Sequence, residues 1–371
     1  MRIVQVANFV KADSGGIRRC LTQLRHEYEL RGHRVTTVVP GSGGENPPAN
    51  FETVKGTAVP FTGGYHAIVG RRPLRDLLEN LQPDLVELSD KTTLAWLPEW
   101  LSRRKVPCAV ISHERTDIVS ARHAPKFLPI PGLVDHFRGR IVEHASVIIC
   151  ASQFAADEFR NDDTRPNQIR LVPLGVDLET FRPVKSASQS DVPSVVVCGR
   201  LSPEKQPLVA VQGFIELLRS TPARLTIIGD GPLRAELEEL TRGLPVTFRG
   251  FVADPREIAQ TIASCDAALN LGPIETFGLA TLELLACGVP VVVSNEGGSR
   301  EVIDTDAGRA VPAAPEEIAR ALEDLLSIPT DIRQRAARSR AEHFPWSSTA
   351  DALLDIYNGL GSGITASRLS A

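Results

Sequence analysis

Short apolar runs recur along the chain and alternate with segments whose apolar residues have helical spacing. This alternation predicts strand–helix–strand units, because the strands of a parallel sheet are covered by helices on both faces. In the first half we expect strands at residues 3–7, 35–39, 85–88, 109–111, 147–150 and 169–172. In the second half we expect strands at residues 194–198, 224–228, 246–250, 267–270, 289–294 and 308–311.

Residues 177–192 lie between the two sets and have hardly an apolar side chain after Val184, which is typical of a linker. A chain of 371 residues also exceeds the usual size of one compact core. We therefore predict an α/β protein with two doubly wound, Rossmann-like domains, residues 1–184 and 185–345, facing each other across a ligand-binding cleft. Residues 346–371 contain a final helix near 347–360 that can cross back to the N-terminal domain, and we expect residues 361–371 to be disordered.

Composition excludes several classes of protein. No run approaches the ~18–20 apolar residues of a membrane span, and residues 1–9 lack the features of a signal peptide, so we expect a cytoplasmic protein. The net charge of −4 argues against a nucleic-acid partner. The six cysteines are far apart and lie mostly in apolar runs, which favours reduced core residues over disulfides or a zinc site: Cys20, Cys108, Cys150, Cys198, Cys265 and Cys287.

Glu275 and Glu283 are separated by seven residues at a point where a loop is expected to become a helix. The start of a helix presents unpaired N–H groups, so the backbone at residues 277–279 can donate to a diphosphate, and Gly278 permits close approach. In this interpretation Glu275 accepts hydrogen bonds from sugar hydroxyls and Glu283 from ribose hydroxyls. The phosphate-binding residues are Phe277, Gly278 and Leu279.

Two cations follow the strand at residues 194–198. Arg200 and Lys205 flank a Ser-Pro turn in Gly-Arg-Leu-Ser-Pro-Glu-Lys, and both can reach one diphosphate. Fixed cations stabilise the charge that develops on a departing nucleoside diphosphate. No Asp-x-Asp segment lies within the segments 200–205 and 275–283 to hold a divalent ion, so we expect no metal and no other cofactor.

These motifs resemble those of the retaining GT-B glycosyltransferases of family 4, and the resemblance extends over nearly the whole chain, most strongly at residues 173–303. It rests on the paired glutamates, the Gly-Arg-Leu-x-x-Glu-Lys segment, the Gly-Asp-Gly-Pro turn at 229–232 and the Pro-x-Gly-Val-Asp passage at 173–177. The resemblance implies the GT-B fold and hexose transfer with retention at the anomeric carbon. It also implies that Arg200, Lys205, Glu275 and His113 act in catalysis.

The same resemblance adds positions in both halves. Gly15 and Gly16 precede a helix and can bring backbone N–H groups close to phosphate, and the segment ending at Val252 is similar to the one that reads the nucleotide base. We interpret the Gly-Asp-Gly-Pro turn mainly as support for the fold. Asp90 and Lys91 follow a predicted strand and can line the acceptor side.

The N-terminal half looks most like bacterial α-mannosyltransferases that use GDP-mannose on lipid acceptors such as phosphatidylinositol. We therefore predict a mannosyltransferase of glycolipid biosynthesis, peripheral on the inner face of the cell membrane. The candidate lipid-facing segments are residues 70–81, with three arginines among leucines, and residues 127–134. The leucines of 70–81 can equally face the core.

Three alternatives remain open. A UDP-sugar donor with a soluble acceptor fits the same motifs, because the loops that read base and hexose are not identified. An isomerase of the UDP-N-acetylglucosamine 2-epimerase type would share the fold. A catalytically silent binding subunit is disfavoured, because Arg200, Lys205 and Glu275 are all present.

Overall fold

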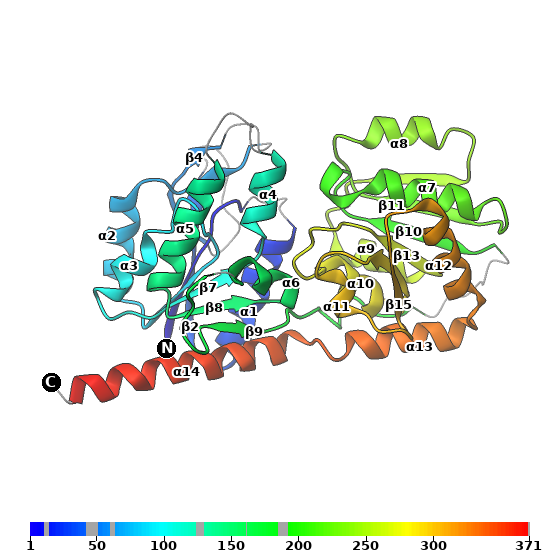
Figure 1. Ribbon diagram of the computed structural model, residues 1–371. Coiled ribbons are helices and arrows are strands. Elements are labelled where there is room, and N and C mark those ends of the chain that lie inside the picture. The colour runs from blue at the N-terminus through cyan, green and yellow to red at the C-terminus, as the bar shows by residue number, and fades with distance from the viewer. Residues whose placement is uncertain are drawn as a thin grey trace. The chain divides into compact units, whose positions relative to one another are not determined.

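The computed structural model describes residues 1–10, 15–41, 51–59, 64–123, 130–160, 162–184 and 192–369. The chain forms two compact units (Figure 1). Unit 1 comprises Met1–Pro173 and Trp346–Ala371, and unit 2 comprises Leu174–Pro345. Each is an α/β unit built on a parallel sheet.

Unit 1 is built on a seven-stranded sheet of order β3-β2-β1-β6-β7-β8-β9, in which all neighbours are parallel. Its strands are β1 (Arg2–Val6), β2 (Arg34–Gly41), β3 (Phe51–Lys55), β6 (Leu85–Leu88), β7 (Cys108–Ser112), β8 (Val147–Cys150) and β9 (Ile169–Leu171). Its helices are α1 (Gly16–Leu30), α2 (Arg71–Leu81), α3 (Leu97–Ser102), α4 (Thr116–His123), α5 (Ile130–His144), α6 (Gln153–Ala156), η1 (Asp157–Phe159) and α14 (Trp346–Leu369). The sequence pattern missed β3 and the antiparallel ribbon of β4 (Thr57–Ala58) and β5 (His66–Ala67).

The two faces of this sheet have different partners. Alternate residues such as Val4, Val86 and Val110 pack with leucines of α2 and α3 in one apolar core. The other face carries buried Glu87, which accepts hydrogen bonds from the Tyr28 hydroxyl of α1 at 2.6 Å and from Gln5 at 2.9 Å. Strands β6, β7 and β8 are buried along their whole length, as expected for a sheet covered on both sides.

The last helix belongs to unit 1. On α14, Tyr357 donates a hydrogen bond to the same Glu87 carboxylate at 2.8 Å, and Asp351 pairs with Arg31, the C-cap of α1, at 2.6 Å. The helix α14 continues to Leu369, beyond the end near residue 360 that the sequence pattern predicts.

Unit 2 is built on a six-stranded parallel sheet of order β12-β11-β10-β13-β14-β15. Its strands are β10 (Ser194–Cys198), β11 (Arg224–Ile228), β12 (Val246–Gly250), β13 (Ala267–Asn270), β14 (Val291–Ser294) and β15 (Gly308–Val311). Its helices are η2 (Pro203–Lys205), α7 (Pro207–Leu217), α8 (Arg234–Leu240), α9 (Pro255–Ala263), α10 (Leu279–Ala286), α11 (Ser299–Val302), α12 (Pro315–Ser327) and α13 (Thr330–Ala341). All six strands coincide closely with the predicted runs.

The division between the units falls after Pro173, earlier than the predicted boundary at 184. Residues 174–184 pack on unit 2, where Leu174, Val176 and Phe181 are buried. Arg338 of α13 donates to the Phe181 carbonyl at 2.9 Å. The apolar residues of this segment therefore place it in the second core, and the poorly apolar part of the linker, 185–191, lies outside the described residues.

Candidate active site

The sheet of unit 2 reverses its strand order between β10 and β13, since β11 and β12 lie on one side of β10 and β13 on the other. In open parallel sheets, ligands bind at the carboxyl ends of the strands on either side of such a point. The loops that leave β10 and β13 there begin at Gly199 and Leu271. They contain the candidate residues Arg200, Lys205 and Glu275.

A small cavity of about 50 Å³ opens between these two loops. This volume is below the ~300–1,000 Å³ typical of whole-ligand sites, so the cavity can enclose only part of a ligand. The cavity is lined by both polar and apolar groups. The apolar atoms come from β10, β13, α7 and α10, and the polar side chains are Arg200, Lys205, Asn270 and Glu275. The residues are Val197, Cys198, Gly199, Arg200, Lys205, Pro207, Ala210, Leu269, Asn270, Leu271, Glu275 and Ala280.

The loop that carries Arg200 is held by the Gly-Asp-Gly-Pro turn after β11. A Cβ on Gly229, where φ is +132°, would lie 1.9 Å from the Gly199 carbonyl oxygen, so no larger residue fits there. Leu201 donates its backbone N–H to the Asp230 carbonyl at 2.9 Å. The turn therefore supports the site through backbone packing, as the sequence interpretation favoured.

Lys205 and Glu275 form an ion pair across the cavity. The Lys205 Nζ donates to Glu275 Oε1, and the two side chains remain 37% and 19% exposed. The Glu275 backbone is fixed as well, because its carbonyl accepts from Gly298 N–H at 2.6 Å. The structure thus brings together two residues seventy positions apart in the sequence, one cationic and one anionic.

The predicted start of a helix after Glu275 is confirmed, because α10 begins at Leu279 with Gly278 as its N-cap. Gly278 has φ +96°, and a Cβ there would lie 2.5 Å from Ser299 Oγ. The first helical hydrogen bond runs from Leu282 N–H to the Gly278 carbonyl at 3.1 Å, so the N–H groups of the first turn have no acceptor within the helix. Phe277 itself is a core residue, since its ring packs edge-to-face on Phe344.

Two further candidates in unit 2 do not line the cavity described above. Glu283 is buried on α10, 7% exposed. Val252 is half-buried and follows β12, the edge strand of the sheet. Their assignments to ribose and base stay predictions.

In unit 1 the strand order reverses between β1 and β6. Gly15 and Gly16 are exposed, and α1 begins at Gly16 with Gly15 as its N-cap. A Cβ on Gly15 would meet nothing within 4 Å, so local packing does not require glycine there. Their predicted contact with phosphate stays a prediction, and residues 11–14 before them lie outside the described chain.

His113 follows β7, and its Nε2 lies 3.0 Å from the Ser89 hydroxyl beyond β6. Burial, with a smaller contribution from the Lys91 ammonium, lowers the pKa of His113 to about 4. The ring is therefore neutral near pH 7 and can take part in hydrogen bonds without carrying charge.

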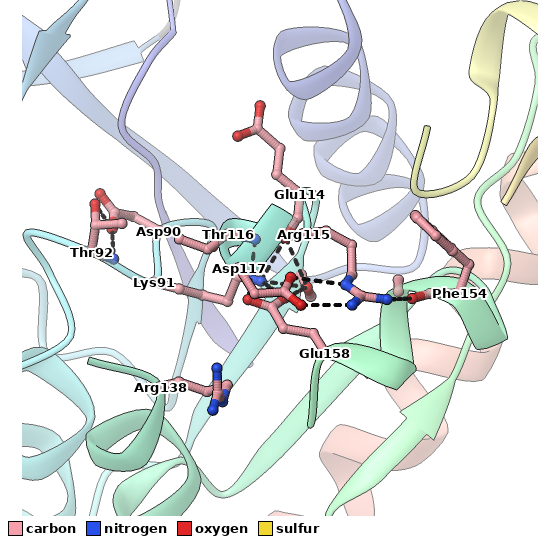
Figure 2. Close-up of polar contacts among 12 residues, drawn as sticks. Asp90, Lys91, Thr92, Glu114, Arg115, Thr116, Asp117, Arg138, Phe154 and Glu158 are labelled. Atoms are coloured by element: carbon pink, nitrogen blue, oxygen red, sulfur yellow. Dashed lines mark hydrogen bonds and ion pairs between the residues drawn. The ribbon is translucent and has the colours of Figure 1, made fainter. Parts of the chain in front are cut away.

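Asp90 and Lys91 do not line an open surface, contrary to the expectation for the acceptor side. They are 5% and 8% exposed. Asp90 accepts a hydrogen bond from Asn8. Figure 2 shows Asp90 beside Thr92, which also donates to it, and Lys91 beside Glu158, with which it forms an ion pair. Sequence reasoning missed Glu158, because a single glutamate after a strand carries no signal of the lysine that it meets in the fold.

The candidate lipid-facing helix α2 places Leu74 and Leu78 in the core, so its leucines do not form an exposed apolar face. Its arginines differ in exposure: the Arg72 side chain is 92% exposed and Arg71 is exposed, whereas Arg75 is half-buried. The guanidinium groups of Arg71 and Arg75 lie 5.4 and 5.1 Å from the ring centroid of the buried Trp96. Val69, just before the helix, is 54% exposed. In the second candidate segment, residues 127–129 lie outside the described chain, and Leu133 is half exposed.

Within the described ranges, no helix is long and apolar enough to cross a membrane. Over those same ranges, no group of three or more His, Cys, Asp and Glu side chains is placed to hold a metal ion.

Two family models match the chain in succession. Residues 14–180 match "Glycosyltransferase Family 4", and residues 192–327 match "Glycosyl transferases group 1". A GDP-mannose-dependent alpha-(1-6)-phosphatidylinositol dimannoside mannosyltransferase of Mycobacterium tuberculosis is 39% identical over 95% of both chains. A D-inositol 3-phosphate glycosyltransferase of Saccharomonospora viridis is 30% identical over 70% of this chain and 66% of its own.

Solved structures share the architecture. Sucrose-phosphate synthase of Thermosynechococcus elongatus aligns with a TM-score of 0.78 at 22% identity, over 98% of this chain and 99% of its own. Anabaena HepE, solved with UDP and glucose, aligns with a TM-score of 0.74 at 19% identity, over 96% and 99%. The fold is GT-B, and from the full-length similarity at 39% identity and the two family matches, this chain belongs to the family 4 glycosyltransferases.

Proposed function

We propose that this chain transfers mannose from GDP-mannose, with retention, to a phosphatidylinositol mannoside or a similar glycolipid. The observation that carries the proposal is the meeting of Arg200, Lys205, Glu275 and the first turn of α10 around one cavity at the switch point of unit 2. The mannosyltransferase relative, 39% identical over nearly the whole chain, supports the choice of donor and acceptor.

Arg200, Lys205 and the amides of Phe277, Gly278 and Leu279 bind the diphosphate in this proposal. As the bond between sugar and phosphate breaks, negative charge grows on the phosphate, and fixed donors stabilise it most in the transition state. Glu275 then binds hydroxyls of the hexose. The pairing of Lys205 with Glu275 supports this division, because both groups are held at the cavity with their charges balanced until a diphosphate competes for the lysine.

The transfer occurs on one face of the sugar. The acceptor oxygen bonds to the anomeric carbon while the bond from that carbon to the phosphate oxygen breaks, and the acceptor proton passes to a phosphate oxygen of the departing GDP. His113, neutral at pH 7, contributes a polar contact to the sugar. The competing chemistry is a covalent glycosyl-enzyme on Glu275. If azide restores activity to the Glu275→Ala variant and a mannosyl azide forms, the result would favour the covalent route.

The chain's own cations and helix amides carry the charge of the diphosphate in this proposal, so no metal is needed. Activity should persist in excess EDTA. Loss of activity on chelation, with recovery on adding Mg²⁺, would contradict this part of the proposal.

The decisive assay combines a panel of sugar nucleotides with lipid acceptors. We expect GDP-mannose and a phosphatidylinositol mannoside to give an α-mannosylated lipid, identified by mass spectrometry and by the anomeric proton signal. A preference for UDP-glucose or UDP-N-acetylglucosamine would change the donor assignment. An epimerised donor without a transferred sugar would replace transfer with isomerisation.

We further propose that the protein binds anionic membrane surfaces through the arginines at the start of α2. Val69, Arg71 and Arg72 supply exposed apolar and cationic groups there. In sedimentation with liposomes, binding should require anionic lipid, and Arg72→Glu should weaken it roughly tenfold. Arg335→Glu, at a similarly exposed arginine of unit 2, is the matched control. Equal binding to neutral and anionic liposomes would contradict the proposed membrane binding.

A further inference from the structure

Lys91 and Glu158 form a buried ion pair at the carboxyl ends of the unit 1 strands (Figure 2). Lys91 lies beyond β6 and Glu158 in η1, which follows β8 and α6. Their side chains are only 7% and 1% exposed. The pair therefore spans the end of β7, the strand between them in the sheet, which leads directly to His113.

The pair holds the loop after β7 from two sides. The Lys91 ammonium donates to Ser112 Oγ at 2.8 Å and to the Glu114 carbonyl at 2.6 Å, in addition to Glu158. The Glu158 carboxylate accepts the backbone N–H of Thr116 at 3.1 Å. The backbone from residue 112 to residue 116 is thus held by hydrogen bonds at Ser112, Glu114 and Thr116.

Burying two charges is expensive, and an apolar pair of similar volume would often give equal or greater stability. An apolar pair could not bind a carbonyl, a hydroxyl and an N–H of one loop at the same time. The Glu114 side chain of this loop is exposed, and in Figure 2 it extends away from the pair. The pair thus fixes the backbone and leaves the side chains of the loop to other partners.

We infer that Lys91 and Glu158 are positioning residues of the transfer reaction, which fix the loop that presents His113 and Glu114 at the end of β7. This inference rests on the proposed mannosyl transfer. Neither residue contacts substrate in this role; both act through the geometry of residues 113–116.

The test is the double variant Lys91→Met/Glu158→Gln, which removes both charges together and leaves no unpaired buried ion. We expect the variant to fold, the amides of residues 113–116 to exchange hydrogen at least tenfold faster, and kcat for lipid mannosylation to fall at least tenfold. The Kd for GDP should not change, because neither residue contacts Arg200, Lys205 or the first turn of α10, which bind the diphosphate in the proposal. Glu158→Gln alone keeps one oxygen acceptor for the Thr116 N–H but leaves the Lys91 ammonium buried without its anion, so it should unfold more readily than the double variant.

The control is Arg138→Met/Asp162→Asn, which removes a 2.8 Å ion pair of the same unit without touching the loop. In this control, hydrogen exchange of the amides of residues 113–116 and kcat for lipid mannosylation should both be unchanged. Wild-type kcat or unchanged exchange in the folded Lys91/Glu158 variant would overturn the inference. Absence of mannosyl transfer by the wild-type protein would instead refute the proposed function, and hydrogen exchange would still decide whether the pair holds the loop.

Discussion

The two units each hold a lysine–glutamate pair at the carboxyl ends of parallel strands, and the pairs differ in exposure. Lys205 and Glu275 line a cavity and keep 37% and 19% of their side-chain surface, whereas Lys91 and Glu158 keep 7% and 1%. Charges beside a cavity can exchange their partner for a substrate. Sealed charges that bind three backbone or hydroxyl groups of one loop cannot. In the roles that we propose, similar chemistry serves binding in one unit and positioning in the other.

The largest difference between the pairs should be in stability. Lys91→Met leaves the Glu158 carboxylate buried without its cation, which typically costs ~3–5 kcal/mol of unfolding free energy. Lys205→Met should cost ~0–1 kcal/mol, because its pair is partly exposed and screened by water. Urea unfolding of both variants checks this. Equal losses would mean that exposure does not separate the two pairs.

The second difference should be in catalysis. Lys205→Met removes a charge that stabilises the departing diphosphate, so kcat/KM should fall ~10²–10³-fold, comparable to the loss of one donor from an oxyanion site. Steady-state kinetics with GDP-mannose measures it. Arg219→Met, an exposed arginine on unit 2, provides the control and should retain wild-type kcat/KM. Turnover by Lys205→Met at the wild-type rate would contradict the assignment.

The open site should also depend on one glycine. Gly278→Ala places a Cβ within 2.5 Å of Ser299 Oγ at φ +96°, so we expect a loss of at least ~1–2 kcal/mol in stability together with weaker GDP binding. Gly139→Ala, in the exposed middle of α5 with nothing within 4 Å, should instead stabilise by ~0.5–1 kcal/mol. Thermal unfolding and GDP titration distinguish the two variants.

A further expected effect is on the pH dependence of stability. His113 has its pKa lowered to about 4 in the fold, from 6.5 in the unfolded chain, by burial and by Lys91. Between pH 6.5 and 4 the unfolded state therefore binds more protons, and this contribution to stability is complete above pH 6.5 and is lost as pH falls. His113→Asn should reduce the slope of unfolding free energy against pH by about one proton in that window. An unchanged slope would place His113 in a more open environment.

The sequence by itself determined most of the fold and located the candidate residues of the donor side. The apolar runs located all six strands of unit 2, and the motif spacing located the start of α10, because strand burial and helix initiation depend on nearby residues. The identities of Arg200, Lys205 and Glu275 as candidates also came from local motifs.

Only the tertiary structure decided which of these groups meet and which are sealed. Lys205 pairs with Glu275, and Lys91 with Glu158, across contacts that join different loops of one sheet. Leu74 and Leu78 of α2 are buried in the core, and residues 174–184 belong to unit 2. Helix α14 belongs to unit 1, where Tyr357 donates a hydrogen bond to Glu87. Burial and pairing between distant segments depend on how the strands are ordered in the sheet, and local sequence periodicity does not contain that order.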